Sequence, residues 1–299
     1  MRGPTIVIEH LTKSFGEVLA VSDLSFTVEP GRVTGFLGPN GAGKTTTLRA
    51  LLGLVAPSSG RALVDGSPYR DLERPLATVG ASLEPTMFHP GRSGRDHLLV
   101  HAIAGGVPRA RVDAVLDRVG LADAARRRVG GYSLGMRQRL GLAGALLGDP
   151  GALVLDEPVN GLDPEGIRWM RGLLGELAAE GRTVLVSSHL LSEVQQTVSE
   201  VVVIARGRLV HEGALDALGG GAQVVVDSPQ REKLAAALKG RATVRADPRG
   251  LRVTGLTAAE LGHLAFGANI ELSQLATVSE GLEEVFLDLV AGGEEVVAP

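Results

Sequence analysis

A glycine-rich loop carries the clearest chemistry in this sequence. Residues 38–45 read Gly-Pro-Asn-Gly-Ala-Gly-Lys-Thr and fit the pattern G-x-x-x-x-G-K-[ST], directly after an apolar run and before a helical pattern. Small residues let backbone N–H groups point at phosphate oxygens, and the start of a helix adds a favourable partial charge. The alternative, a turn that only caps a core helix, is disfavoured by the flanking strand and helix. The loop is therefore predicted to bind a nucleotide.

Each residue of the loop has an expected role in this site. Lys44 would reach the β- and γ-phosphates, and the Thr45 hydroxyl would ligate Mg²⁺. The nucleotide-binding residues predicted here are Gly38, Pro39, Asn40, Gly41, Ala42, Gly43, Lys44, Thr45 and Thr46.

Two acidic residues end a second apolar run. Residues 152–157 read Ala-Leu-Val-Leu-Asp-Glu, which puts Asp156 and Glu157 at the carboxyl end of a predicted strand. In a parallel sheet, ligands lie beyond these ends. Asp156 is expected to hold Mg²⁺, and Glu157 to polarise the attacking water as general base. Alone, the pair could equally cap the next helix or be solvated, but the glycine-rich loop favours catalysis.

The elements that must position these residues alternate along the chain. Apolar, β-branched runs predict strands over 5–9, 24–28, 33–37, 61–65, 76–83, 152–155, 183–187 and 201–204. Helices are expected from Lys44 to before Pro57, within an Ala/Leu/Arg-rich segment at about 93–148, and over 164–180 and 190–198. This order predicts an α/β core with a mixed, mainly parallel sheet and a helical insertion.

After a hairpin-like segment at 209–213 the order of elements changes. The pattern predicts strand 223–227, helix 230–238, strands 243–246 and 251–254, helix 258–265 and strand 270–275. This β-α-β-β-α-β order is typical of a ferredoxin-like unit. With the run Gly219–Gly221 as boundary, we predict one domain over 1–218, a small α+β domain over 222–290 that ends in a helix, and a tail over 291–299.

Composition narrows the classes of partner. The chain has 299 residues, of which 44% are hydrophobic and 21% charged, so it can bury a core. Its net charge of −4 gives no electrostatic reason to expect nucleic acid, and the absence of Cys excludes disulfides. No segment reaches the roughly 18 consecutive apolar residues that a membrane span needs. A role at a membrane would therefore be that of a peripheral partner.

A third motif identifies a family. Residues 132–138, Tyr-Ser-Leu-Gly-Met-Arg-Gln, resemble the ABC signature, with Leu-Gly-Met in place of Gly-Gly-Gln. With the loop and the acids, they make about residues 4–215 similar to the nucleotide-binding domain of ABC ATPases. The resemblance implies a P-loop NTPase fold of ABC type that uses ATP and Mg²⁺. It also implies that Ser133 and Gly135 bind the γ-phosphate of ATP held by another subunit, in a homodimer or heterodimer.

Four further residues take roles from this resemblance. Asp163, in Asn-Gly-Leu-Asp, resembles part of the D-loop, which communicates across the dimer. His189 resembles the switch histidine at the γ-phosphate, and Phe15 the aromatic residue that stacks on adenine, although a core Phe is the competing interpretation. Glu84 stands where the family usually has Gln. We expect it to act in catalysis and metal binding with a slower rate or altered coupling, while ATP binding persists.

The resemblance implies a function as well. The form of the signature together with a C-terminal extension is similar to ATPases of multidrug or antibiotic exporters. We expect export of a drug, antibiotic or lipid-like compound through a separate membrane permease, from the cytoplasmic side of the cell membrane. Segment 85–95, with Met87, Phe88 and His89, is expected to dock that permease or else to pack inside the domain. The alternative is a non-transport ABC ATPase acting on ribosomes or DNA.

Overall fold

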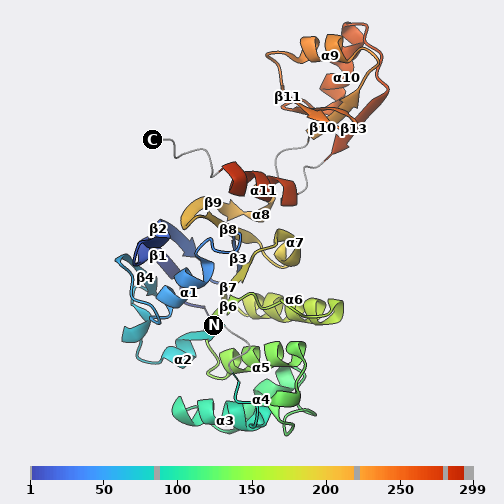
Figure 1. Cartoon of the computed structure of the whole chain (residues 1–299). Helices are drawn as coiled ribbons and strands as arrows, with labels where there is room; N and C mark the ends of the chain where they lie inside the picture. Colours follow the sequence, from blue (N-terminus) through green and yellow to red (C-terminus); the bar gives the residue numbers. More distant parts are fainter. Residues whose placement is uncertain (1, 84–87, 219–222, 279–281, 293–299) are drawn as a thin grey trace. The chain divides into compact units, whose positions relative to one another are not determined.

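The computed structural model describes residues 2–83, 88–218, 223–278 and 282–292 (Figure 1). Among these residues the chain divides into two compact units. The first comprises residues 2–215 together with 289–292, and the second runs from Asp216 to Asp288. Each unit has a hydrophobic core of its own. Two predicted features, the boundary run Gly219–Gly221 and most of the tail, lie outside the described residues.

The first unit is built on a six-stranded sheet. Its strands, in spatial order, are β5 (Val79–Ser82), β6 (Ala152–Asp156), β7 (Thr183–Ser188), β3 (Val33–Leu37), β8 (Glu200–Ala205) and β9 (Arg208–Ala214). Neighbours are parallel except β8 and β9, which form an antiparallel hairpin. Every residue of β3, β6 and β7 is buried, as expected for central strands covered on both faces. The predicted mainly parallel sheet is confirmed.

The register of this sheet brings three strand ends to one edge. Leu37 pairs with Ser188, and Asp156 pairs with Ser187. The loop after β3, the acids at the end of β6 and the turn after β7 therefore open at the same edge. This alignment is what allows residues far apart in the sequence to form one site.

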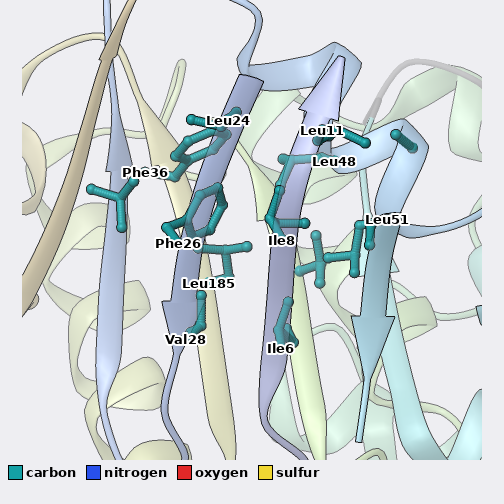
Figure 2. Close-up of a cluster of buried hydrophobic side chains, with 14 of the residues drawn as sticks. Ile6, Ile8, Leu11, Leu24, Phe26, Val28, Phe36, Leu48, Leu51 and Leu185 are labelled. Carbon is teal, nitrogen blue, oxygen red and sulfur yellow. The ribbon is translucent and has the colours of Figure 1, made fainter. Parts of the chain in front are cut away.

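A second, antiparallel sheet of order β2-β1-β4 completes the layers of the first unit. It consists of β1 (Ile6–Phe15), β2 (Val18–Val28) and β4 (Ser59–Val64). The first two strands are longer than predicted because pairing continues, through several register shifts, from Ile6 with Val28 to Phe15 with Val18. Figure 2 shows the core that joins this sheet to the parallel one through helix α1 (Lys44–Leu51). Its labelled members include Ile8, Phe26, Phe36, Leu48 and Leu185.

The predicted helical insertion is present as α3 (Gly94–Ala104), α4 (Ala110–Arg118) and α5 (Leu134–Leu146). Later come α6 (Pro164–Ala179), α7 (Leu191–Val194) and α8 (Leu215–Leu218). Two further expectations are wrong in extent. The helix predicted over 190–198 is a single turn, and the strand predicted over 76–83 starts only at Val79, because Pro75 begins helix α2 (Pro75–Thr78). In the described part of the chain, every helix is too short or too polar to cross a bilayer.

The second unit has the predicted β-α-β-β-α-β order. Its sheet runs β11-β12-β10-β13 with all neighbours antiparallel, and its elements are β10 (Gln223–Asp227), α9 (Arg231–Leu238), β11 (Thr243–Asp247), β12 (Gly250–Thr254), α10 (Ala258–Gly267) and β13 (Gln274–Val278). The last strand was predicted too early. Ile270 instead lies in the turn after α10, where its N–H donates to the Ala265 carbonyl and its side chain is buried. Helix α11 (Leu282–Gly292) follows.

Candidate active site

The glycine-rich loop joins β3 to α1 and borders a cavity of about 370 Å³. Gly43 has a φ of 103°, and a Cβ there would lie 2.5 Å from the Ala20 carbonyl oxygen. A Cβ on Gly38 would lie 2.4 Å from the carbonyl oxygen of Ile204. Side chains are thus excluded from both ends of the loop, so its backbone can bend tightly. Helix α1 begins without a side-chain cap, which leaves its N-terminus suited to an anion.

Lys44 contacts three oxygen atoms at the start of α1. Its Nζ donates to the carbonyl oxygens of Gly38 at 2.7 Å and Pro39 at 3.3 Å, and lies 3.6 Å from Oε1 of Glu157. Burial lowers the pKa of Lys44, while the carboxylates of Glu157 and Asp156 oppose that shift. A buried ammonium group beside the loop can exchange these contacts for phosphate oxygens.

Asp156 lies between two hydroxyl groups. Thr45 Oγ1 donates to its Oδ2 at 2.7 Å, and Ser187 Oγ donates to its Oδ1. Ser187 Oγ also accepts from the backbone N–H of Glu157 at 3.0 Å, so one hydroxyl orients both acids. A hydroxyl and a carboxylate, side by side at the phosphate loop, are the oxygen ligands that Mg²⁺ prefers. The residues present therefore fit a magnesium ion.

Glu157 has a conformation that few non-glycine residues adopt. Its φ is 50°, in the left-handed region, and such backbone strain concentrates at functional sites. Oε2 lies 2.7 Å from Nδ1 of His189 and accepts from Nδ2 of Asn160 at 3.1 Å, while Oε1 faces Lys44. The carboxylate, the histidine ring and the asparagine all border the cavity of the loop. The carboxylate therefore faces the same cavity as the glycine-rich loop.

Most of the predicted site residues meet at this cavity. Those that line it are Asn40, Gly41, Ala42, Gly43, Lys44, Thr45, Thr46, Glu157 and His189. Gly38 and Pro39 contribute through their carbonyl oxygens to Lys44, and Asp156 through Thr45. Phe15 does not line the cavity; it is half exposed at the end of β1, with Lys13 Nζ 4.8 Å from its ring centre. Glu84 lies outside the described residues, so its assigned role remains a prediction.

The signature-like residues form a separate surface. Ser133 caps α5 by accepting from the N–H of Met136 at 3.2 Å, and Asp163 caps α6 by accepting from Gly166 at 2.7 Å. Neither they nor Gly135 line the cavity of their own chain. The segments that carry the two caps are in contact: a Cβ added to Gly161 would lie 2.1 Å from the side chain of Leu134. This surface cannot act on a nucleotide bound in the described cavity.

Sequence reasoning did not assign roles to Ser187, Asn160 and Gln138. Ser187 was predicted only as the end of a strand, yet it contacts both acids. Its role depends on the β6–β7 register, which no pattern within either segment specifies. Asn160 and Gln138 lie inside recognised motifs. Asn160 contacts Glu157 within one turn, whereas the contact of Gln138 with the Asn160 carbonyl joins two motifs 22 residues apart.

Known protein families match two parts of the chain. Residues 21–160 match the family model described as ABC transporter, and residues 222–283 match a domain of unknown function, DUF8746. The bacitracin transport ATP-binding protein BcrA of Bacillus licheniformis is 44% identical over 211 residues, covering 70% of this chain and 69% of BcrA. The lantibiotic transport ATP-binding protein SrtF of Streptococcus pyogenes is 36% identical over 70% of this chain and 90% of its own length. The uncharacterized ABC transporter ATP-binding protein YdbJ of Bacillus subtilis is 34% identical over 99% of this chain and 100% of its own length.

Solved structures share the fold of the first unit. An ATP-binding subunit of an ABC transporter superposes with a TM-score of 0.65 at 26% identity, covering 71% of this chain and 91% of that one. The cbiO1 protein of Clostridium perfringens, part of the transporter complex cbiONQ, gives a TM-score of 0.62 at 29% identity, covering 70% of this chain and 88% of its own.

Proposed function

This chain belongs to the ABC transporter family of ATP-binding, ATP-hydrolysing subunits, and we propose that it powers export of a drug, antibiotic or lipid-like compound through a separate membrane permease. Support for this class of substrate comes from relatives named for bacitracin and lantibiotic transport. The same names do not favour action on ribosomes or DNA.

The observation that carries the reaction is the setting of Glu157. Its carboxylate faces the cavity of the phosphate loop with Lys44, His189 and Asn160 around it. In this proposal, Glu157 accepts a proton from the water that attacks the γ-phosphorus, while Lys44 and His189 stabilise the phosphoryl oxygens. Thr45 and Asp156 would hold Mg²⁺, which supplies further charge neutralisation on the phosphates when bound.

A second nucleotide-binding domain would complete the site. Ser133 and Gly135 sit near the start of α5, where backbone N–H groups can bind an anion, but outside the cavity of their own chain. We infer that they close over ATP held by a second copy or by a similar chain. Closure around two ATP molecules would then be the conformational step that the permease receives.

The permease would contact the first unit from the cytoplasmic side of the membrane, which makes this chain a peripheral subunit. A groove of about 530 Å³ between β5, α3 and α5 is lined by apolar side chains that include Leu83, Phe88 and Leu140. It adjoins the segment 85–95, of which residues 88–95 are described. We propose that apolar side chains of the permease dock at this groove.

The full-length chain and its Glu157→Gln variant test this function together. We expect ATP hydrolysis to fall at least about 100-fold in E157Q, since a positioned general base contributes about 10²–10⁴-fold. Light scattering should show that E157Q is a dimer with Mg-ATP and a monomer without nucleotide. Glu165→Gln, an exposed carboxylate in the first turn of α6, is the matched control. Hydrolysis by E157Q at the wild-type rate would refute the base, and a monomer with ATP bound would refute the shared site.

A further inference from the structure

The turn that follows Glu157 binds back to the catalytic carboxylate. Asn160 donates from its side-chain Nδ2 to Oε2 of Glu157 at 3.1 Å, and from its backbone N–H to the Glu157 carbonyl at 3.2 Å. The same Oε2 also contacts Nδ1 of His189. Without the asparagine amide, this oxygen would lose one of these two contacts and could turn toward Lys44. The asparagine thus restricts the direction in which Glu157 points.

A buried side chain of α5, the helix of the signature-like residues, holds this turn in place. Gln138, in the second turn of α5, is only 6% exposed, and its Nε2 donates to the carbonyl oxygen of Asn160 at 3.1 Å. Burying an amide in a helix is favourable only when it has such a partner. Next to it, Leu134 of α5 packs against Gly161, which has a φ of 74°. The turn is therefore fixed to the first two turns of α5 by a hydrogen bond and by packing.

We propose that Asn160 is a positioning residue for Glu157 and that Gln138 anchors it, so the aim of the catalytic carboxylate depends on the position of helix α5. The inference rests on the proposed role of Glu157 as general base. It adds a connection within one chain, from the helix that Ser133 caps to the carboxylate of Glu157 in the cavity. Asn160 acts through Glu157, so its loss should slow the chemical step without weakening ATP binding.

Steady-state ATPase kinetics of the full-length chain test the first step of the proposal. For Asn160→Ala we expect kcat to fall about tenfold, the scale of one hydrogen bond to a charged group, with KM for ATP within about twofold of wild type. For Asn160→Asp, which keeps the size but replaces the donor with a second carboxylate, we expect a larger fall of about 100-fold. Asn269→Ala, the same change in the second unit, should leave kcat unchanged.

Two outcomes would overturn this first step. A merely structural asparagine would tolerate the isosteric change, so N160D at the wild-type rate refutes the donor role. A rise in KM with kcat unchanged would mean that Asn160 contacts nucleotide and does not position the base. Measuring E157Q in parallel shows which proposal has failed. An inactive E157Q with a fully active N160A refutes only the positioning role of Asn160. An active E157Q refutes the role of Glu157 as general base in the proposed function.

A double-mutant cycle tests the second step. Gln138→Met keeps an unbranched side chain of similar length but removes the donor, and we expect kcat to fall about threefold with the thermal midpoint near that of wild type. If the two residues act in series, Q138M in the N160A background should cause no further loss of kcat. Multiplicative losses would refute the anchoring role, because Gln138 would then act by a route that does not include Asn160.

Discussion

Ser187 offers the sharpest test of how the sheet builds the site, because one hydroxyl contacts both acids. Ser187→Ala removes the donor to Asp156 Oδ1 and the acceptor for the Glu157 N–H, and both serine and aspartate are buried. Hydrogen bonds to charged groups contribute about 1.5–3 kcal/mol, and an unpaired buried N–H adds about 1 kcal/mol, so we expect a loss of about 2.5–4 kcal/mol in the free energy of unfolding. For a unit of this size that corresponds to roughly 5–16 °C in thermal midpoint.

The variant should also lose activity. Partners that orient a metal ligand typically matter by about 10–100-fold, so kcat should fall by that factor and the Mg²⁺ concentration for half-maximal hydrolysis should rise about tenfold. Thr183→Val is the matched control at the opposite end of β7, where the buried Thr183 hydroxyl donates to the Pro4 carbonyl at 2.6 Å. It should lose stability while its magnesium dependence stays unchanged. If S187A hydrolyses ATP with wild-type kcat and magnesium dependence, the hydroxyl does not orient these acids.

Two further predictions concern pH. Burial, with smaller contributions from His101 and Arg92, lowers the pKa of His97 from 6.5 to about 4. Because the unfolded chain takes up this proton at a higher pH than the folded chain, the first unit should lose stability as pH falls from about 6.5 to 4. His97→Met should flatten that loss, which can be followed by the fluorescence of Trp169, the single tryptophan. The backbone N–H of Arg249 and the side chain of Arg252 lower the pKa of the buried Asp247 to about 2. The ionised carboxylate should therefore stabilise the second unit above about pH 4, and this stabilisation should be lost as pH falls toward 2. Asp247→Asn should remove this pH dependence from the hydrogen exchange of β10 and β12, and an unchanged profile would exclude Asp247 as its source.

The outline of the fold could be predicted because local patterns carried it. Continuous apolar runs marked β3, β6 and β7, and Pro164 after Asp163 marked the start of α6. Extents failed where a neighbour decided them. Ile270 is β-branched, as strand residues often are, but its N–H donates to the Ala265 carbonyl and closes the turn that follows α10. Leu76 follows a proline that starts a helical turn, so its apolar side chain does not extend β5.

The site divides in the same way. Lys44, Thr45, Asp156 and Glu157 were predictable because each belongs to a segment whose own pattern implies its chemistry. The contact of Ser187 with Asp156 follows from strand register, and that of Gln138 with Asn160 from helix packing, neither of which is written in one segment. Phe15 shows the reverse case: the motif order predicts it at the nucleotide, but the described residues that line the cavity do not include it.

The arrangement of the turn between β6 and α6 gives a physical reason why hydrolysis would wait for a second domain. One end of this turn holds Glu157 in the cavity of its own chain, and the other end, at Asp163, lies on the surface that carries Ser133. Between them, Gln138 connects Asn160 to the signature helix. When a second ATP binds against the start of α5, a shift of that helix would move the Asn160 carbonyl and, through the asparagine amide, the Glu157 carboxylate. A displacement of a few tenths of an ångström is enough to matter, because a general base must lie within about 2.6–3.2 Å of the proton that it accepts. Each chain would then hydrolyse its own nucleotide only when its signature surface is engaged by the nucleotide of its partner.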